Sequence, residues 1–189
     1  MSRPLRIAIL AHSTNPRGGV VHALELGDAL TRLGHEAVVH APDPKGAGFF
    51  RPSLCRTVSV AASTVGADVA EMVRIRAGDY VSHFEDPANR GFDVFHAQDG
   101  ISGNALATLK QRGFIPGFAR TVHHVDAFRD PELLALQRRA IVEADRHFVV
   151  SRLWQDLLAE MFALGSTIVG NGVDTARFSP VADGREAAL

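Results

Sequence analysis

The feature that most constrains the fold is a repeated order of segments: a short apolar run, a polar loop, then a helical pattern. The first run, residues 5–11, is apolar without alternation, which is typical of a strand buried on both faces of a parallel sheet. After a loop over residues 12–19, apolar residues recur at helical spacing between residues 20 and 33, and Gly34 ends the pattern. A second strand over residues 36–41 completes a strand–helix–strand unit.

The same order continues along the rest of the chain. Asp68 and Ser151 stand where helix N-caps are expected, Pro131 at the start of a helix, and Gly165 where the last helix should end. The sequence therefore predicts an α/β fold, a Rossmann-like, doubly wound, mostly parallel sheet with helices on both faces. The further predicted strands cover residues 57–61, 93–97, 119–123, 146–150 and 166–169, and the further helices cover residues 67–84, 99–112 and 131–144 and the stretch between Ser151 and Gly165.

Composition narrows the class of protein. The net charge is −1, from 20 Lys and Arg against 21 Asp and Glu, so we expect no nucleic-acid partner. The single cysteine, Cys55, cannot form an internal disulfide, which favours a reducing compartment. The first apolar run is too short to span a membrane. We expect a cytoplasmic protein, while a peripheral membrane contact through one amphipathic helix stays open.

Parallel α/β sheets bind ligands beyond the carboxyl ends of their strands, so the loops that follow strands are the candidate sites. The first of these loops ends with Gly18-Gly19, directly before a helix. Such a pair lets a phosphate approach backbone N–H groups at the positive end of the helix dipole. It can also simply make the turn, and the residues alone favour neither reading.

Two later loops carry histidine and carboxylate side chains. His96 lies near the end of the predicted strand at residues 93–97 and Asp99 follows that strand, where Asp99 fits a helix cap better than a ligand contact. His123 and His124 follow Thr121-Val122. Adjacent histidines at the end of a strand fit a ligand site better than a core, because pleating directs them to opposite sides.

Stricter motifs are absent from the sequence. Gly46-Ala47-Gly48 begins like a dinucleotide fingerprint, but Arg51 occupies the place of its third glycine. No phosphate loop ends in Gly-Lys followed by Ser or Thr, and the nine histidines lack metal-ligand spacing. We therefore expect no metal site.

Five segments in order resemble the N-terminal domain of a GT-B fold glycosyltransferase of family 4, and the likeness covers nearly the whole chain. Gln98 stands where that family often has a histidine. The segments are Gly18-Gly19 with the helix after it, Asp-Val-Phe-His-Ala-Gln-Asp at residues 93–99, Thr-Val-His at residues 121–123, Val-Val-Ser at residues 149–151, and Asn-Gly-Val-Asp at residues 171–174 with Arg-Phe-Ser-Pro at residues 177–180.

The resemblance implies a fold of two Rossmann-like domains that face each other across a cleft. Residues 1–180 would form the N-terminal, acceptor-side domain, and residues 181–189 a linker or the start of a missing C-terminal, donor-binding domain. The implied activity is transfer of a sugar from a nucleotide-sugar to an acceptor that the sequence does not identify. Transfer would retain the anomeric configuration and need neither a metal nor a cofactor, and this half alone would be inactive.

The resemblance also implies roles for the residues of the first and fifth strand ends. Gly18 and Gly19 would bind the donor diphosphate through backbone N–H groups, stabilising the negative charge that grows as it leaves. His123 would be the catalytic residue, in contact with the transferred sugar or polarising the reacting centre.

Further roles concern the acceptor side and the domain junction. His96, Asp99 and His124 would contact the acceptor, although His124 stands where the family often has Asp or Gly. Asn171 would lie at the junction with the second domain. His22, on the helix after the glycine pair, is expected on the surface.

Two other functions remain open at the level of sequence. One is half of a sugar-nucleotide epimerase of similar architecture, which needs no acceptor. The other is a non-catalytic carbohydrate-binding module, in which the same fold holds a ligand without chemistry.

Overall fold

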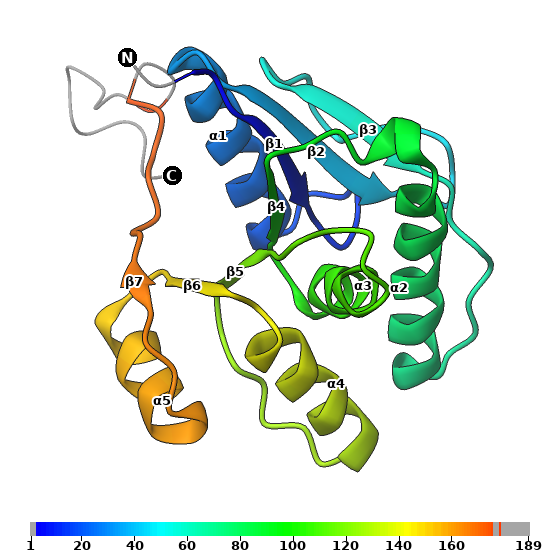
Figure 1. Cartoon of the computed structure of the whole chain (residues 1–189), viewed down its shortest axis with the longest axis vertical. Helices are drawn as coiled ribbons and strands as arrows, with labels where there is room; N and C mark the ends of the chain where they lie inside the picture. Colours follow the sequence, from blue (N-terminus) through cyan, green and yellow to red (C-terminus); the bar gives the residue numbers. More distant parts are fainter. Residues whose placement is uncertain (1–2, 176–177, 179–189) are drawn as a thin grey trace, which may run out of the picture.

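The computed structural model describes residues 3–175 and residue 178. Within them lies one seven-stranded sheet of order β3-β2-β1-β4-β5-β6-β7, parallel at every pairing (Figure 1). This confirms the predicted doubly wound α/β fold. The strands are β1 Arg6–Leu10, β2 Glu36–Pro42, β3 Arg56–Val60, β4 Val94–Ala97, β5 Ala119–Val122, β6 Arg146–Val149 and β7 Thr167–Ile168, and the helices are α1 Gly18–Arg32, α2 Val69–Glu85, α3 Gly100–Gln111, α4 Pro131–Val142 and α5 Arg152–Phe162, with a short 3₁₀ helix at Pro87–Asn89.

Helices cover both faces of the sheet, which explains the unbroken apolar run at its centre. Ile7 and Ile9 of β1 pack with residues of α1, whereas Ala8 and Leu10 pack with residues of α2 and α3 on the opposite face. Because successive side chains of a strand point to opposite faces, a strand with two covered faces must be apolar throughout.

Most predicted helix ends are confirmed. Asp68 and Ser151 cap α2 and α5 with their side chains, and Gly34 has a φ of 88° after α1. The prediction for Gly165 was wrong, because α5 ends at Phe162 and Ala163 takes the left-handed conformation with a φ of 56°. The sequence pointed to glycine since it adopts positive φ at little cost, but here an alanine adopts it two residues earlier.

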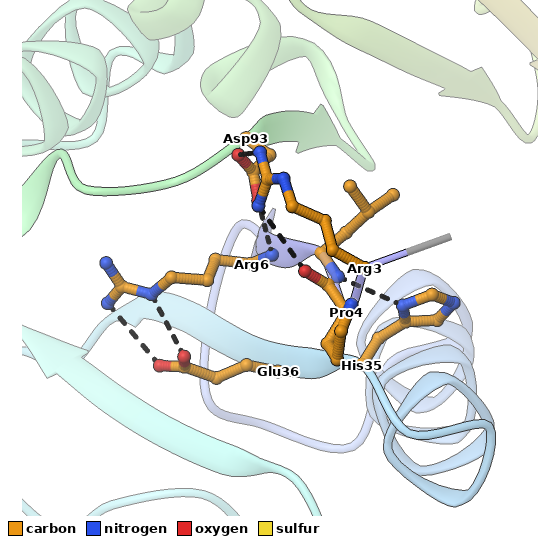
Figure 2. A network of polar contacts seen from close by, with 7 residues as sticks. Arg3, Pro4, Arg6, His35, Glu36 and Asp93 are labelled. Carbon is orange, nitrogen blue, oxygen red and sulfur yellow. Dashed lines mark hydrogen bonds and ion pairs between the residues drawn. The ribbon is translucent and has the colours of Figure 1, made fainter. Parts of the chain in front are cut away.

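Polar side chains tie the amino ends of three central strands together at one edge of the sheet (Figure 2). Asp93, just before β4, accepts a hydrogen bond of 2.8 Å from the backbone N–H of Arg6 and forms an ion pair of 2.6 Å with Arg3. Arg6 pairs in turn with Glu36 at the start of β2. These exposed pairs join β1, β2 and β4 at the amino ends, and the cavity described below lies at the carboxyl ends.

Candidate functional site

The main cavity lies where the direction of strand progression changes. β1 pairs with β2 on one side and with β4 on the other, so the loops after β1 and β4 leave toward opposite sides of the sheet. In open α/β sheets a crevice forms at this point, beyond the carboxyl ends of the strands. Here it holds a cavity of about 1350 Å³, whose walls include His12, Gly18, Gly19, His22, Gln98, Asp99, Arg120, His123 and His124, with Asn171 from the segment after β7.

The glycine pair forms the first turn of α1 at the wall of this cavity. Arg17 precedes the helix without a side-chain hydrogen bond to it, so the first N–H groups of α1 are not capped by a side chain. Neither glycine has a positive φ. A Cβ at Gly18 would meet no atom within 4 Å, and at Gly19 the nearest atom would be Cδ2 of His123 at 3.9 Å. The fold itself therefore does not require glycine here, and the space beside the helix start is open to a ligand.

His123 lies next to this turn, so the structure brings the first and fifth strand ends together. Its Nε2 is 3.1 Å from Oε1 of Gln98. Because a carboxamide oxygen only accepts, Nε2 of His123 carries the proton and Nδ1 keeps a lone pair. Burial, joined by the charges of His22 and Arg120, lowers the pKa of His123 to about 4, so the ring is neutral at pH 7.

His22 was predicted on the surface, and the structure shows it partly buried at the wall of the cavity. Its ring lies 4.8 Å from the ring of His123, edge to face, and lines the same cavity. Nδ1 of His22 donates a hydrogen bond of 3.1 Å to Oδ1 of Asn171. Burial lowers the pKa of His22 from its ordinary value. The sequence signal that we missed is its spacing: His22 follows Gly19 by three residues, which places both on one helix face.

Asp99 and His96, both expected on the acceptor side, are placed differently. Asp99 caps α3 by accepting a hydrogen bond of 2.9 Å from the N–H of Ser102, and its carboxylate also lines the cavity. His96 is 9% exposed and is not part of the cavity wall. Its Nε2 lies 2.8 Å from Oγ1 of Thr121 instead. The pleat directs the side chains of His96 and Thr121 to the same face of the sheet, so His96 packs against the neighbouring strand on that face and not at the open end.

His124 also departs from the expected arrangement. We predicted a strand over residues 119–123 with the two histidines at its carboxyl end, and β5 stops one residue earlier, at Val122, so both histidines lie in the loop after it. His123 turns inward, while the side chain of His124 is 63% exposed and lies 3.3 Å from Asp126. His124 thus reaches the rim of the cavity and not its floor.

Two cavity residues, Gln98 and Arg120, were not identified as functional from the sequence. Gln98 is 2% exposed, its Nε2 has no hydrogen-bond partner in the described part of the chain, and its Oε1 positions His123. Arg120 is 6% exposed and lies in the middle of β5. A charged residue inside a predicted strand is the signal that could have identified it, since arginine is rarely buried without a partner.

Two features of the described residues bear on other kinds of site. No group of three or more His, Cys, Asp or Glu side chains there is arranged to hold a metal ion. None of the helices in residues 3–175 is both long and apolar enough to cross a lipid bilayer. That the function needs no metal stays a prediction.

Comparison with known proteins identifies the family of the chain. A family model described as Glycosyltransferase Family 4 matches residues 16–177. No curated protein sequence matches the chain. The fold is similar to that of a sucrose-phosphate synthase from Thermosynechococcus elongatus, with a TM-score of 0.66 and 20% identity over 89% of this chain and 90% of that one.

Two further structures are similar over part of their length. The catalytic domain of starch synthase IV from Arabidopsis thaliana, bound to ADP and acarbose, matches with a TM-score of 0.70 and 14% identity over 96% of this chain. A UDP-N-acetylglucosamine 2-epimerase matches with a TM-score of 0.60 and 13% identity over 89% of this chain. The chain spans 54% and 49% of these two structures, so it corresponds to about half of each.

Proposed function

Because the chain belongs to glycosyltransferase family 4, we propose that it forms the acceptor-side half of an enzyme that transfers a sugar from a nucleotide-sugar to an acceptor, with retention of configuration. The observation that carries the proposal is the juxtaposition of Gly19 and His123 at the cavity wall, where a Cβ added to Gly19 would lie 3.9 Å from Cδ2 of His123, although the two residues are about a hundred positions apart in the chain. A glycine turn and an imidazole at one crevice can act on the same sugar phosphate.

The donor diphosphate binds at the start of α1. Gly18 and Gly19 offer N–H groups at the positive end of the helix dipole, and the missing side chains leave room for phosphate oxygens. Negative charge grows on the diphosphate as the bond to the sugar breaks. Preorganised N–H donors stabilise that charge more strongly in the transition state than in the bound donor, so they lower the barrier.

His123 acts as a hydrogen-bonding group and not as a cation. With a pKa of about 4 it is uncharged at pH 7, so it does not supply a positive charge to the leaving group. With Nε2 held by Gln98, the Nδ1 lone pair can accept a hydrogen bond from a sugar hydroxyl. We assign His123 the role of positioning the transferred sugar against the acceptor.

The acceptor binds on the α3 side of the cavity, where Asp99 and His12 lie 3.9 Å apart. Asn171 binds His22 beside the glycine turn and marks the junction with a donor-binding domain. Residues 1–180 form the acceptor-side domain in this proposal, with residues 181–189 as the link to the second. Residues 176, 177 and 179–189 lie outside the described residues, so this boundary stays a proposal.

The proposal is tested with the 189-residue chain and with the same chain extended by a downstream donor-binding domain. Both are incubated with a panel of nucleotide-sugars, and release of the nucleoside diphosphate is followed by chromatography, with nuclear magnetic resonance of the sugar product. We expect consumption of a donor by the extended protein alone, with the anomeric configuration kept. His123→Ala should abolish it, while His35→Ala, at the opposite edge of the sheet, should retain it.

Three results would contradict the proposal. A complete donor site that consumes no nucleotide-sugar would indicate a carbohydrate-binding module. Conversion of the sugar nucleotide to an epimer without any acceptor would indicate an epimerase, whose fold the chain also shares. Turnover that survives in His123→Ala would remove this residue from the active site.

A further inference from the structure

A buried arginine in the cavity wall lacks a partner of opposite charge. Arg120 is 6% exposed. One of its terminal nitrogens, Nη1, donates a hydrogen bond of 2.9 Å to the backbone oxygen of Thr121, and that is its one hydrogen bond within residues 3–175. Nε of Arg120 is enclosed without a partner. No carboxylate of the described residues lies within 4.0 Å of its guanidinium, while the cavity does border it.

A buried cation without a counter-charge lowers the stability of the folded chain, so the presence of Arg120 at this position needs an explanation. Removing an ion from water costs several kcal/mol unless a counter-charge and hydrogen bonds replace the water, and arginine cannot escape this cost by losing its proton near neutrality. Burial lowers the pKa of Arg120 only to about 10, so the charge is present at pH 7. The guanidinium therefore offers unused N–H donors in a fixed fork, the geometry that binds a carboxylate or phosphate through two oxygens.

The nearest negative side chain does not satisfy this charge. Asp99 is close enough to raise the pKa of Arg120, yet it forms no ion pair with it in this structure. One oxygen of Asp99 accepts from Ser102 at the start of α3. The other has no hydrogen-bond partner among the described residues. Asp99 thus reduces the cost of burying Arg120 without occupying its donors.

The strand register places Arg120 away from the donor phosphate site. Arg120 is paired with Ala97 of β4, so their side chains share a face of the sheet. Ala97 packs with residues of α2 and α3, whereas α1, which carries the glycine pair, covers the opposite face. Arg120 therefore lies on the side of the cavity that the proposed function assigns to the acceptor.

We propose that Arg120 binds an anionic group of the acceptor, a carboxylate or a phosphate, through the unused donors of its guanidinium. That the anion belongs to the acceptor rests on the proposed function, but anion binding at Arg120 can be tested without turnover. An acceptor held in this way carries at least one oxyanion near the hydroxyl that receives the sugar.

The test is a nuclear magnetic resonance titration of the ¹⁵N-labelled 189-residue chain with inorganic phosphate and, separately, with acetate. We expect the Nε–H resonance of Arg120 to shift with at least one anion, and the anion that saturates at lower concentration identifies the acceptor group. Arg139 is an internal control, because its guanidinium already donates to Asn104, Thr108 and Gln111. Its resonance should not move.

The variant Arg120→Met separates a ligand-binding role from a structural one. We expect it to weaken binding of the anion by about tenfold or more, since a charge-assisted hydrogen-bonded pair is lost. We also expect its midpoint of thermal unfolding without anion to equal or exceed that of the natural chain, because an unpaired buried charge has been removed. Arg120→Lys should keep part of the anion affinity.

Three results would overturn the inference. One is an Nε–H resonance of Arg120 that does not shift with either anion. Another is a destabilised Arg120→Met variant with unchanged anion affinity, which would indicate a structural arginine. The third is a resonance that responds to UDP or ADP but to neither simple anion, which would place Arg120 at the donor. Anion binding to Arg120 together with no consumption of any nucleotide-sugar by the extended protein would instead reject the proposed function and leave the anion site standing.

Discussion

Gly34 and Gly18 differ in the reason for which a glycine is needed. Gly34 has a φ of 88°, a conformation that strains other residues, so the turn after α1 requires glycine. Gly18 lacks a positive φ and faces open space. The fold itself therefore does not require glycine at position 18, which supports a role in contact with a ligand.

We therefore predict that Gly18→Ala leaves the free energy of unfolding unchanged or raises it by about 0.4–1 kcal/mol, because alanine restricts the unfolded chain. In the complete enzyme the same variant should raise KM for the nucleotide-sugar about tenfold or more, since a methyl group enters the phosphate site. Urea unfolding and donor kinetics measure the two effects. Gly78→Ala on the exposed side of α2 is the matched control and should leave KM unchanged. An unchanged KM in Gly18→Ala would argue for a mere turn.

At the scale of elements, α3 begins with a residue that has two possible tasks. Asp99 caps the helix through one carboxylate oxygen, and both backbone and side chain of Ser102 complete a capping box with it. A cap needs an acceptor atom but not a charge. The site, in contrast, depends on the carboxylate, which lies 3.9 Å from His12 and close to Arg120.

Two substitutions at Asp99 separate these tasks. Asp99→Ala should lower the free energy of unfolding by about 1 kcal/mol through loss of the cap, whereas Asp99→Asn keeps an acceptor oxygen and should cost less than about half of that. Both variants should reduce transfer to the acceptor in the complete enzyme. Chemical unfolding gives the first quantity and product formation the second. Full transfer activity in Asp99→Asn would restrict Asp99 to the role of a cap.

The contact between α3 and α4 depends on a glycine for a different reason. A Cβ at Gly103 would lie 2.8 Å from Cβ and 2.9 Å from the backbone oxygen of Ala140. Since backbone cannot give way as a flexible side chain does, Gly103→Ala should separate the two helices and destabilise the chain by about 1–3 kcal/mol.

Gly78→Ala serves as the control for this prediction too. Gly78 lies within a helix with no atom near its Cβ position, so alanine there should stabilise the chain by roughly 0.5–1 kcal/mol. Unfolding in urea, followed by the fluorescence of the single tryptophan, Trp154, compares the two variants. Equal stability of Gly103→Ala and the natural chain would show that the α3–α4 contact is looser than described.

At the scale of the whole molecule, buried histidines make stability depend on pH. Burial is the main cause that lowers the pKa of His40 and His96 to about 3 and of His123 to about 4. The unfolded chain binds these protons near the ordinary pKa of about 6.5, while the folded chain does not. The unfolded state therefore binds more protons between about pH 6.5 and 4, and stability falls as the pH falls through this window.

Each proton that the unfolded chain binds and the folded chain does not should lower the free energy of unfolding by about 1.4 kcal/mol per unit decrease in pH, once the pH is well below 6.5. Unfolding in urea at pH 7.5, 6, 5 and 4.5 measures the slope. His40→Leu should make the slope shallower by about one proton, because both nitrogens of His40 are buried without a partner among the described residues and no hydrogen bond is lost. Stability that stays constant from pH 7.5 to 4.5 would contradict the burial of these rings.

The sequence alone determined the kind and order of the elements, because these depend on local rules. A strand covered on both faces must be apolar at every position, and glycine or a capping side chain ends a helix, so β1, α1 and Asp68 could be identified directly. After α5, Ala163 and Gly165 are alternative positions for the left-handed residue that ends the helix, and the sequence pattern predicted the wrong one. The family, too, could be identified from the order of short motifs.

The tertiary structure decided which of the candidate residues form the site. The pairing of β1 with β4 and of β4 with β5 brings Gly19, Asp99 and His123 to one cavity, and no local pattern specifies these neighbours. The pleat then turns His96 to the face of the sheet that carries Thr121, and contacts with Asn171 and His123 partly cover His22. Whether a polar side chain faces a cavity or a core depends on what the rest of the chain packs against it. The same holds for Arg120. Its charge is buried only when the sheet has formed, and nothing local in the sequence shows that it will be removed from water.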